Sequence, residues 1–175
     1  MLCSFIVVGC SSPPQVDENA ERRAAFAALD FQSFDQTLDG GWRTLGTAEK
    51  YSDAAQAIEW YLVDREGLEA WQRSILHFHA GQMCAFDGRG DAAIAHFEQS
   101  FTADEPDDSP VRWNAYVRAS IAFLKGDREG LVATRDEIAA GPSTNGRIPN
   151  LDVVDRFITG FGGSYADAYR GNSGR

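Results

Sequence analysis

Two histidines and a cysteine near the middle of the chain are residues whose types could bind a metal ion. His77 and His79 lie two residues apart, and Cys84 follows His77 by seven residues. On a helix, residues two apart point in nearly opposite directions, and seven residues span about 10 Å along the axis. A zinc ion needs three or four ligands that converge on one point. The spacing therefore predicts no metal site and no cofactor, and we expect these side chains to pack or to lie on the surface.

Other residue patterns that could support catalysis are weak. The acidic pairs Asp104-Glu105 and Asp107-Asp108 lie in the proline-broken run ADEPDDSP, which is typical of a solvated linker. The chain has no Ser/His/Asp or Cys/His nucleophile signature, and GFGGS lacks the strand–turn–helix context of a phosphate-binding loop. We therefore expect a protein that is not an enzyme. Catalytic residues that converge without a local motif remain the alternative.

The composition describes a packed, acidic protein. Its 175 residues suffice for one domain or a short array of repeats, and 43% are hydrophobic. The formal net charge of −10 argues against nucleic acid as a partner, because affinity for phosphates comes mainly from Lys and Arg.

The N-terminal segment predicts a lipid anchor. The first ten residues, MLCSFIVVGC, are apolar and uncharged, and a Ser/Pro-rich polar run follows. Val7-Val8-Gly9-Cys10 resembles a bacterial lipobox, in which a small residue precedes a cysteine that is lipidated. The resemblance implies a signal segment at 1–9, a lipid on Cys10 and a tether at 10–20. Acyl chains would hold the protein at a membrane, each buried CH₂ contributing about 0.8 kcal/mol, and Ser11 is compatible with the outer membrane.

Two features of that segment favour a different interpretation. No basic residue precedes the apolar run, and the run is short for a signal segment. A start of translation upstream of Met1 would account for both. The alternative is a soluble cytoplasmic protein that begins with an apolar stub.

The remainder of the chain has helical periodicity and no alternating strand pattern. We expect a helical domain at 21–171 and a frayed tail at 172–175. The expected helices are 21–29, 42–48, 53–63, 66–87, 91–101, 111–124, 129–140, 151–161 and 165–169.

The turns between paired helices recur at a regular interval. Glu49, Gly88, Gly126 and Gly163 are 39, 38 and 37 residues apart. Such periods in a helical chain indicate stacked hairpins. The central unit, 74–107, is similar to a tetratricopeptide repeat, with the pattern residues His77, Ala80-Gly81, Ala93, Phe97 and Pro106. The resemblance implies an all-α fold, a short right-handed superhelix of about four imperfect antiparallel hairpins.

Small residues in the central unit should let its two helices approach closely. Gly81 and Ala93 lie where a larger side chain would push the helices apart, and Phe97 should fill the space beside them. The other units match less well, since Arg135 stands where the third unit needs an apolar residue.

The resemblance also implies an inner groove lined by the first helices of successive hairpins. Its candidate binding residues are Arg43, Phe78, Gln82, Phe86, Trp113, Tyr116 and Ser120. Further positions on the same face are Gln36, Asp39, Asn150 and Val153. Aromatic and amide groups of this kind suit a peptide or protein partner. The alternative is that the aromatic side chains pack between neighbouring helices.

Taken together, these patterns predict a non-catalytic protein- or peptide-binding scaffold anchored in a bacterial envelope and facing the periplasm. The alternatives are a soluble cytosolic adaptor and an envelope immunity or inhibitor protein whose acidic surface blocks a basic toxin.

Overall fold

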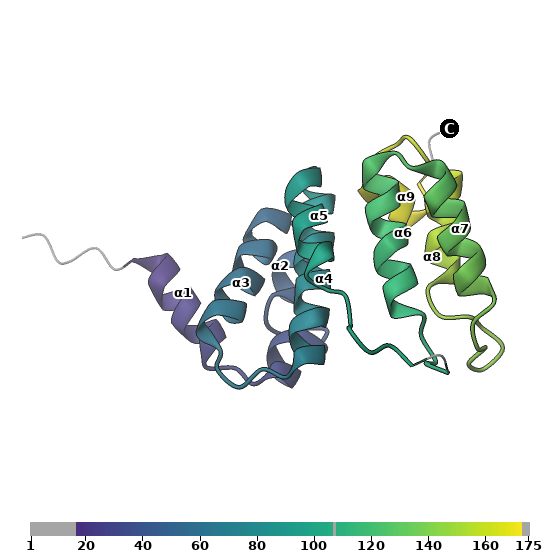
Figure 1. Cartoon of the computed structure of the whole chain (residues 1–175). Helices are drawn as coiled ribbons and strands as arrows, with labels where there is room; N and C mark the ends of the chain where they lie inside the picture. The colour runs from purple at the N-terminus through teal and green to yellow at the C-terminus, as the bar shows by residue number, and fades with distance from the viewer. Residues whose placement is uncertain (1–16, 107, 173–175) are drawn as a thin grey trace, which may run out of the picture.

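The computed structural model describes residues 17–106 and 108–172, and every regular element in those residues is a helix (Figure 1). The all-α class predicted from the sequence is therefore confirmed. In chain order the elements are α1 (Glu18–Ala27), the π-helical η1 (Gln32–Gln36), α2 (Arg43–Thr47), α3 (Tyr51–Asp64), α4 (Ala70–Phe86), α5 (Gly90–Glu98), α6 (Trp113–Lys125), α7 (Arg128–Ala139), α8 (Leu151–Thr159) and α9 (Tyr165–Arg170).

The predicted lipid-attachment residue Cys10 and the predicted signal segment at 1–9 lie outside the described residues. The membrane anchor therefore stays a prediction. Among the helices that the structure describes, none has the length and apolar character needed to cross a bilayer.

Consecutive helices pack in four pairs, α2 with α3, α4 with α5, α6 with α7, and α8 with α9. A residue with positive φ lies in the turn of each pair: Glu49, Gly88, Gly126 and Gly162, at 58°, 77°, 68° and 87°. These residues are 39, 38 and 36 apart, close to the predicted period. In the last turn the left-handed residue is Gly162, whereas the sequence pattern pointed to Gly163.

The first three of these turns share one backbone hydrogen bond. In each, the amide that follows the left-handed residue donates to a carbonyl five residues earlier, as in Lys50 to Leu45, Arg89 to Cys84, and Asp127 to Ala122. This bond ends a helix with a left-handed residue and reverses the chain. The same local chemistry therefore produces three of the four turns.

The π-helical turn η1 lies between the first two helices expected from the sequence, 21–29 and 42–48, where no helix was predicted. The Thr37 amide donates to the Gln32 carbonyl at 3.0 Å, which closes the wider turn. Phe34 stacks on Tyr61 of α3 with ring centroids 3.8 Å apart. A Cβ on Gly41 would lie 2.0 Å from the Phe34 carbonyl oxygen, so the chain can fold back this closely only at glycine.

Helix α4 begins at Ala70, four residues later than the predicted start at residue 66. Gly67 has a φ of 73° and interrupts the helix there. Glu69 then caps α4 reciprocally with Gln72, since each side chain bonds the backbone of the other.

The close approach of α4 and α5 lies at Gly81, as the sequence predicted. A Cβ on Gly81 would lie 2.7 Å from two ring carbons of Phe97 and 3.1 Å from the Ala93 carbonyl oxygen. Gly81, Ala93 and Phe97 are all buried. The close packing of these helices therefore depends on the absence of a Cβ atom at Gly81.

Gly81→Ala should lower the free energy of unfolding by about 1–2 kcal/mol. Overpacking against Phe97 costs about 1–3 kcal/mol, and the better helix propensity of alanine offsets up to about 1 kcal/mol. Urea unfolding followed by circular dichroism measures the change. Gly90→Ala in the same pair is the control, because a Cβ there meets nothing within 4 Å. Equal stability of both variants would contradict the close packing at Gly81.

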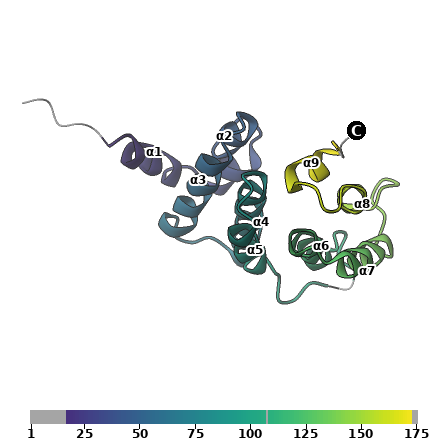
Figure 2. The same ribbon diagram turned by 90° about the horizontal axis from the view of Figure 1, so that it is seen from above.

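Aromatic contacts join the first half of the described chain, α1–α5, to the second, α6–α9. Phe78 of α4 lies 4.9 Å from Trp113 and 5.0 Å from Tyr116 between ring centroids. Phe86, at the end of α4, lies 5.7 Å from Tyr165 and 5.2 Å from Tyr169. Figure 2 shows α9 on the side of α8 that faces α4. The inner face of α4 is thus covered by the second half of the molecule.

Candidate functional site

Asp35 on η1 is a buried carboxylate with three side-chain hydrogen bonds. It accepts from the Trp42 indole N–H at 2.8 Å, from His79 Nδ1 at 2.8 Å and from the Gln36 amide at 2.6 Å. Burial alone would raise the pKa of Asp35, but the hydrogen bonds from His79 and Trp42 outweigh it, and the pKa is lowered. A charged Asp35 therefore fixes the positions of Trp42 and His79.

The Asp35–His79 pair resembles the arrangement in which a buried carboxylate orients a catalytic histidine. Nε2 of His79 forms no hydrogen bond with the residues that the structure describes, and none of their hydroxyl or thiol groups donates to it. The contacts present give this pair a positioning role beside the neighbouring pocket.

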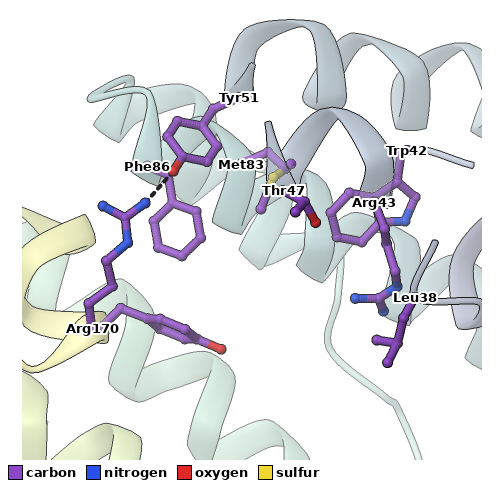
Figure 3. Close-up of a pocket in the computed structure, with 10 residues that line it drawn as sticks. Leu38, Trp42, Arg43, Thr47, Tyr51, Met83, Phe86 and Arg170 are labelled. Atoms are coloured by element: carbon purple, nitrogen blue, oxygen red, sulfur yellow. Dashed lines mark hydrogen bonds between the residues drawn. The ribbon is translucent and has the colours of Figure 1, made fainter. Parts of the chain in front are cut away.

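That pocket has a volume of about 270 Å³ and lies where the loop after η1, α2, α3, α4 and α9 meet (Figure 3). This volume is slightly below the range of pockets that enclose a whole drug-sized molecule. The pocket therefore suits one or two side chains of a partner. It is lined by Leu38, Trp42, Arg43, Gly46, Thr47, Tyr51, Met83, Phe86, Tyr169 and Arg170.

Arg43 lies on one side of the pocket, stacked on an aromatic ring. Its guanidinium carbon lies 4.6 Å from the centroid of the Trp42 ring. Its Nε donates to the backbone carbonyl of Asp35. Its two terminal nitrogens have no hydrogen-bond partner among the described residues. The guanidinium is therefore held by Trp42 and Asp35, while two of its nitrogens remain available to a ligand.

Arg170, at the end of α9, lies on the other side. It donates to the Tyr51 hydroxyl, which Figure 3 marks with a dashed line, and reaches Glu49 at 3.4 Å. Its guanidinium carbon lies 5.8 Å and 5.7 Å from the ring centroids of Tyr51 and Phe86. These contacts hold α9 against the first half of the molecule.

The charge of the pocket is opposite to that of the protein. Its lining has two arginines and no Asp or Glu among the described residues, whereas the chain has a formal net charge of −10. The terminal nitrogens of Arg43 would attract an anionic group into this pocket, whereas Arg170 already pairs with Glu49.

The predicted groove residues divide into three groups in the structure. Arg43 and Phe86 line the pocket. Trp113 is half-buried and donates through Nε1 to the Ser100 carbonyl at 2.8 Å. The other four predicted residues, Phe78, Gln82, Tyr116 and Ser120, are buried. Of the further positions, Val153 is buried too. In this arrangement the buried side chains do not face a partner.

Phe78 packs on Trp113 and Tyr116 of α6, and Gln82 and Ser120 are covered by Tyr165 of α9. The Tyr165 ring packs among aromatic side chains, and its hydroxyl lies beside Gln82 and Ser120. The faces of α4 and α6 that carry the predicted groove residues are mostly covered by other helices of the same chain. Packing, the alternative interpretation, accounts for four of the seven candidates.

Sequence reasoning missed Trp42, Tyr51 and Arg170 as pocket residues. Tyr51 and Arg170 are separated by 119 residues in the chain, so no local motif could connect them. Trp42 follows the Asp39-Gly40-Gly41 turn. Its position after that turn predicts the start of a helix but does not indicate where the indole ring lies.

A second polar cluster lies between α3, α4 and α5. Glu59, Cys84 and His96 each offer one ligand atom, and these atoms all lie within 4.8 Å of one another. His96 Nε2 lies 3.2 Å from Glu59 Oε1, and His96 Nδ1 lies 3.2 Å from His77 Nδ1. Burial and the charge of His96 lower the pKa of His77 to about 4. Burial raises the pKa of the Cys84 thiol.

The spacing of His77, His79 and Cys84 along one helix predicted no group of metal-binding side chains, whereas the structure brings such a group together from three helices. Cys84 and His77 do not share a site through their own helix. Instead α3 and α5 bring Glu59 and His96 to Cys84, across separations of 25 and 12 residues.

Comparisons with protein-family models, with curated proteins and with solved structures found no match to this chain.

Proposed function

We propose that this chain is a non-catalytic helical scaffold, similar to tetratricopeptide-repeat proteins, that holds a partner protein by a carboxylate placed in the Arg43–Arg170 pocket. The observation that carries the proposal is the lining of that pocket. Two arginines and several aromatic rings lie together in a strongly acidic protein, with no acidic residue in the lining among the described residues.

The chemistry of the pocket supports a carboxylate. A guanidinium forms strong charge-assisted hydrogen bonds with a carboxylate, and two parallel bonds fix its orientation. Arg43 is preorganised on Trp42, so binding costs little side-chain entropy. The pocket also offers the apolar surfaces of Leu38, Met83 and Phe86 to a neighbouring side chain.

The helical pairs support a repeat scaffold. Their left-handed turn residues recur at 36 to 39 residues, and three turns share the same hydrogen bond. On the basis of the lipobox-like segment ending at Cys10, we further propose that this scaffold acts at a bacterial envelope.

A library of peptides with free carboxyl ends, selected against the whole chain, tests the binding proposal. We expect enrichment of peptides that combine a carboxylate with an apolar side chain. Arg43→Gln should weaken the binding of the selected peptides by roughly 10- to 100-fold, because a hydrogen bond to a charged group contributes about 1.5–3 kcal/mol. Isothermal titration calorimetry gives the affinities.

Arg118→Gln is the matched control, because Arg118 is an exposed arginine that pairs with Glu137 on α7 and does not line the pocket. Enrichment of basic peptides would contradict the proposal. So would affinities that are the same for the unaltered chain and for Arg43→Gln.

A further inference from the structure

We propose that Glu59, Cys84 and His96 form a binding site for Zn²⁺, independent of the pocket. The three ligand atoms come from three successive helices, α3, α4 and α5, and lie within 4.8 Å of one another. They belong to two helix pairs that pack firmly, so the backbone already holds the ligands together.

The types of ligand select the ion. Thiolate, imidazole and carboxylate are the three protein ligands of zinc. Magnesium and calcium take oxygen ligands, and a buried thiol beside an imidazole does not suit them. The Cys84 side chain is fully buried, and its sulfur forms no disulfide with the described residues.

The separation of two of the three ligand atoms already fits a tetrahedral ion. Zn–N and Zn–O bonds of about 2.0–2.1 Å place two tetrahedral ligand atoms about 3.3 Å apart. His96 Nε2 and Glu59 Oε1 are 3.2 Å apart. Rotation of the Cys84 side chain toward these two atoms is the remaining adjustment, since the three atoms are within 4.8 Å.

His77 provides the outer support that a zinc-bound histidine needs. When His96 binds through Nε2, its proton lies on Nδ1 and needs an acceptor. Nδ1 of His77 lies 3.2 Å from Nδ1 of His96 and can accept it. Binding releases the proton of the Cys84 thiol to solvent and leaves His96 as a neutral imidazole with its one proton on Nδ1; a second proton leaves to solvent where His96 is charged beforehand.

An ion can reach the site from the surface. The Glu59 side chain is 42% exposed and the His96 side chain 15% exposed, whereas Cys84 forms the closed inner end. Three protein ligands leave one tetrahedral position, which a water molecule or a partner's side chain would fill.

Co²⁺ and Zn²⁺ titrations of the whole metal-free chain test this site. Co²⁺ should give a near-ultraviolet thiolate charge-transfer band and strong visible bands of a tetrahedral ion. Zn²⁺, measured against a chromophoric chelator, should bind with a Kd below about 1 µM and remove the Co²⁺ spectrum. Cys84→Ala should abolish the charge-transfer band and weaken the affinity for Zn²⁺ by about 100-fold or more. His77→Gln should weaken it by about 10-fold.

Two further variants guard against misinterpretation. Glu59→Gln changes a partly exposed side chain, so it keeps the fold and should still weaken Zn²⁺ by about 10-fold or more. Glu98→Gln, an exposed carboxylate on the same helix as His96, should leave the affinity unchanged. Equal Zn²⁺ affinity in the unaltered chain and in Cys84→Ala, or a Co²⁺ spectrum without the thiolate band, would overturn the proposal and indicate ions held by surface carboxylates.

Discussion

Tyr165→Ala should lower the free energy of unfolding by about 3–5 kcal/mol, the usual cost of deleting a large aromatic side chain from a core. Tyr165 is 3% exposed. Its ring centroid lies 4.9 Å from that of Phe157, 5.7 Å from Phe86 and 5.8 Å from Phe123. These rings belong to α8, α4 and α6. Loss of the Tyr165 ring would therefore loosen three helices at once.

Tyr165→Phe, in contrast, should not lower the free energy of unfolding. The Tyr165 hydroxyl is buried and has no hydrogen-bond partner among the described residues, although Gln82 and Ser120 lie beside it. A buried hydroxyl without a partner costs about 1–3 kcal/mol, so removing it should leave stability unchanged or raise it. Urea unfolding of both variants measures the two effects. A loss of more than about 1 kcal/mol in Tyr165→Phe would show that the hydroxyl is hydrogen-bonded.

Asp35→Ala should lower the free energy of unfolding by about 3 kcal/mol at neutral pH. The carboxylate is fully buried, and its removal leaves the N–H groups of Trp42 and His79 without their acceptor. Asp39→Asn is the matched control, because Asp39 lies four residues away and is exposed. A similar small effect of both changes would contradict the role given to Asp35.

The effect of Asp35 should also depend on pH. Because its pKa is lowered on folding, its stabilising effect is fully present above the unfolded value of about 3.9 and is lost as the pH falls through the folded value. The stability difference between the unaltered chain and Asp35→Asn should therefore shrink below about pH 4. Denaturant titrations at several pH values measure this difference. A constant difference down to pH 2 would contradict the lowered pKa.

The helices themselves could be predicted because their signals are local. The repeated turn at Gly88 and Gly126 follows from a glycine after an apolar helical stretch. The close approach at Gly81 follows from the small residues of the central unit, and the structure places Phe97 there.

The sites could not be predicted, because their residues meet only through tertiary packing. Asp35 and His79 are 44 residues apart, and Glu59 and His96 are 37 apart. The π-helical turn that positions Asp35 has no periodic signal, and buried contacts of Phe34 hold it. The position of an aromatic residue such as Phe78 in the helical periodicity is the same whether its side chain contacts a partner protein or another helix of its own chain. The sequence therefore cannot distinguish these two cases.

The contact of Arg170 with Tyr51 changes how the protein should fold as a whole. In a linear array each unit touches only its neighbours, so the end units fray independently. Here the last helix pair touches the first, across 119 residues. Closing so long a loop is an entropic cost that is met late, after the intervening pairs have formed. During synthesis Phe86, at the end of α4, would therefore stay uncovered until α9 has been made, because Tyr165 and Tyr169 are the α9 side chains that pack on it.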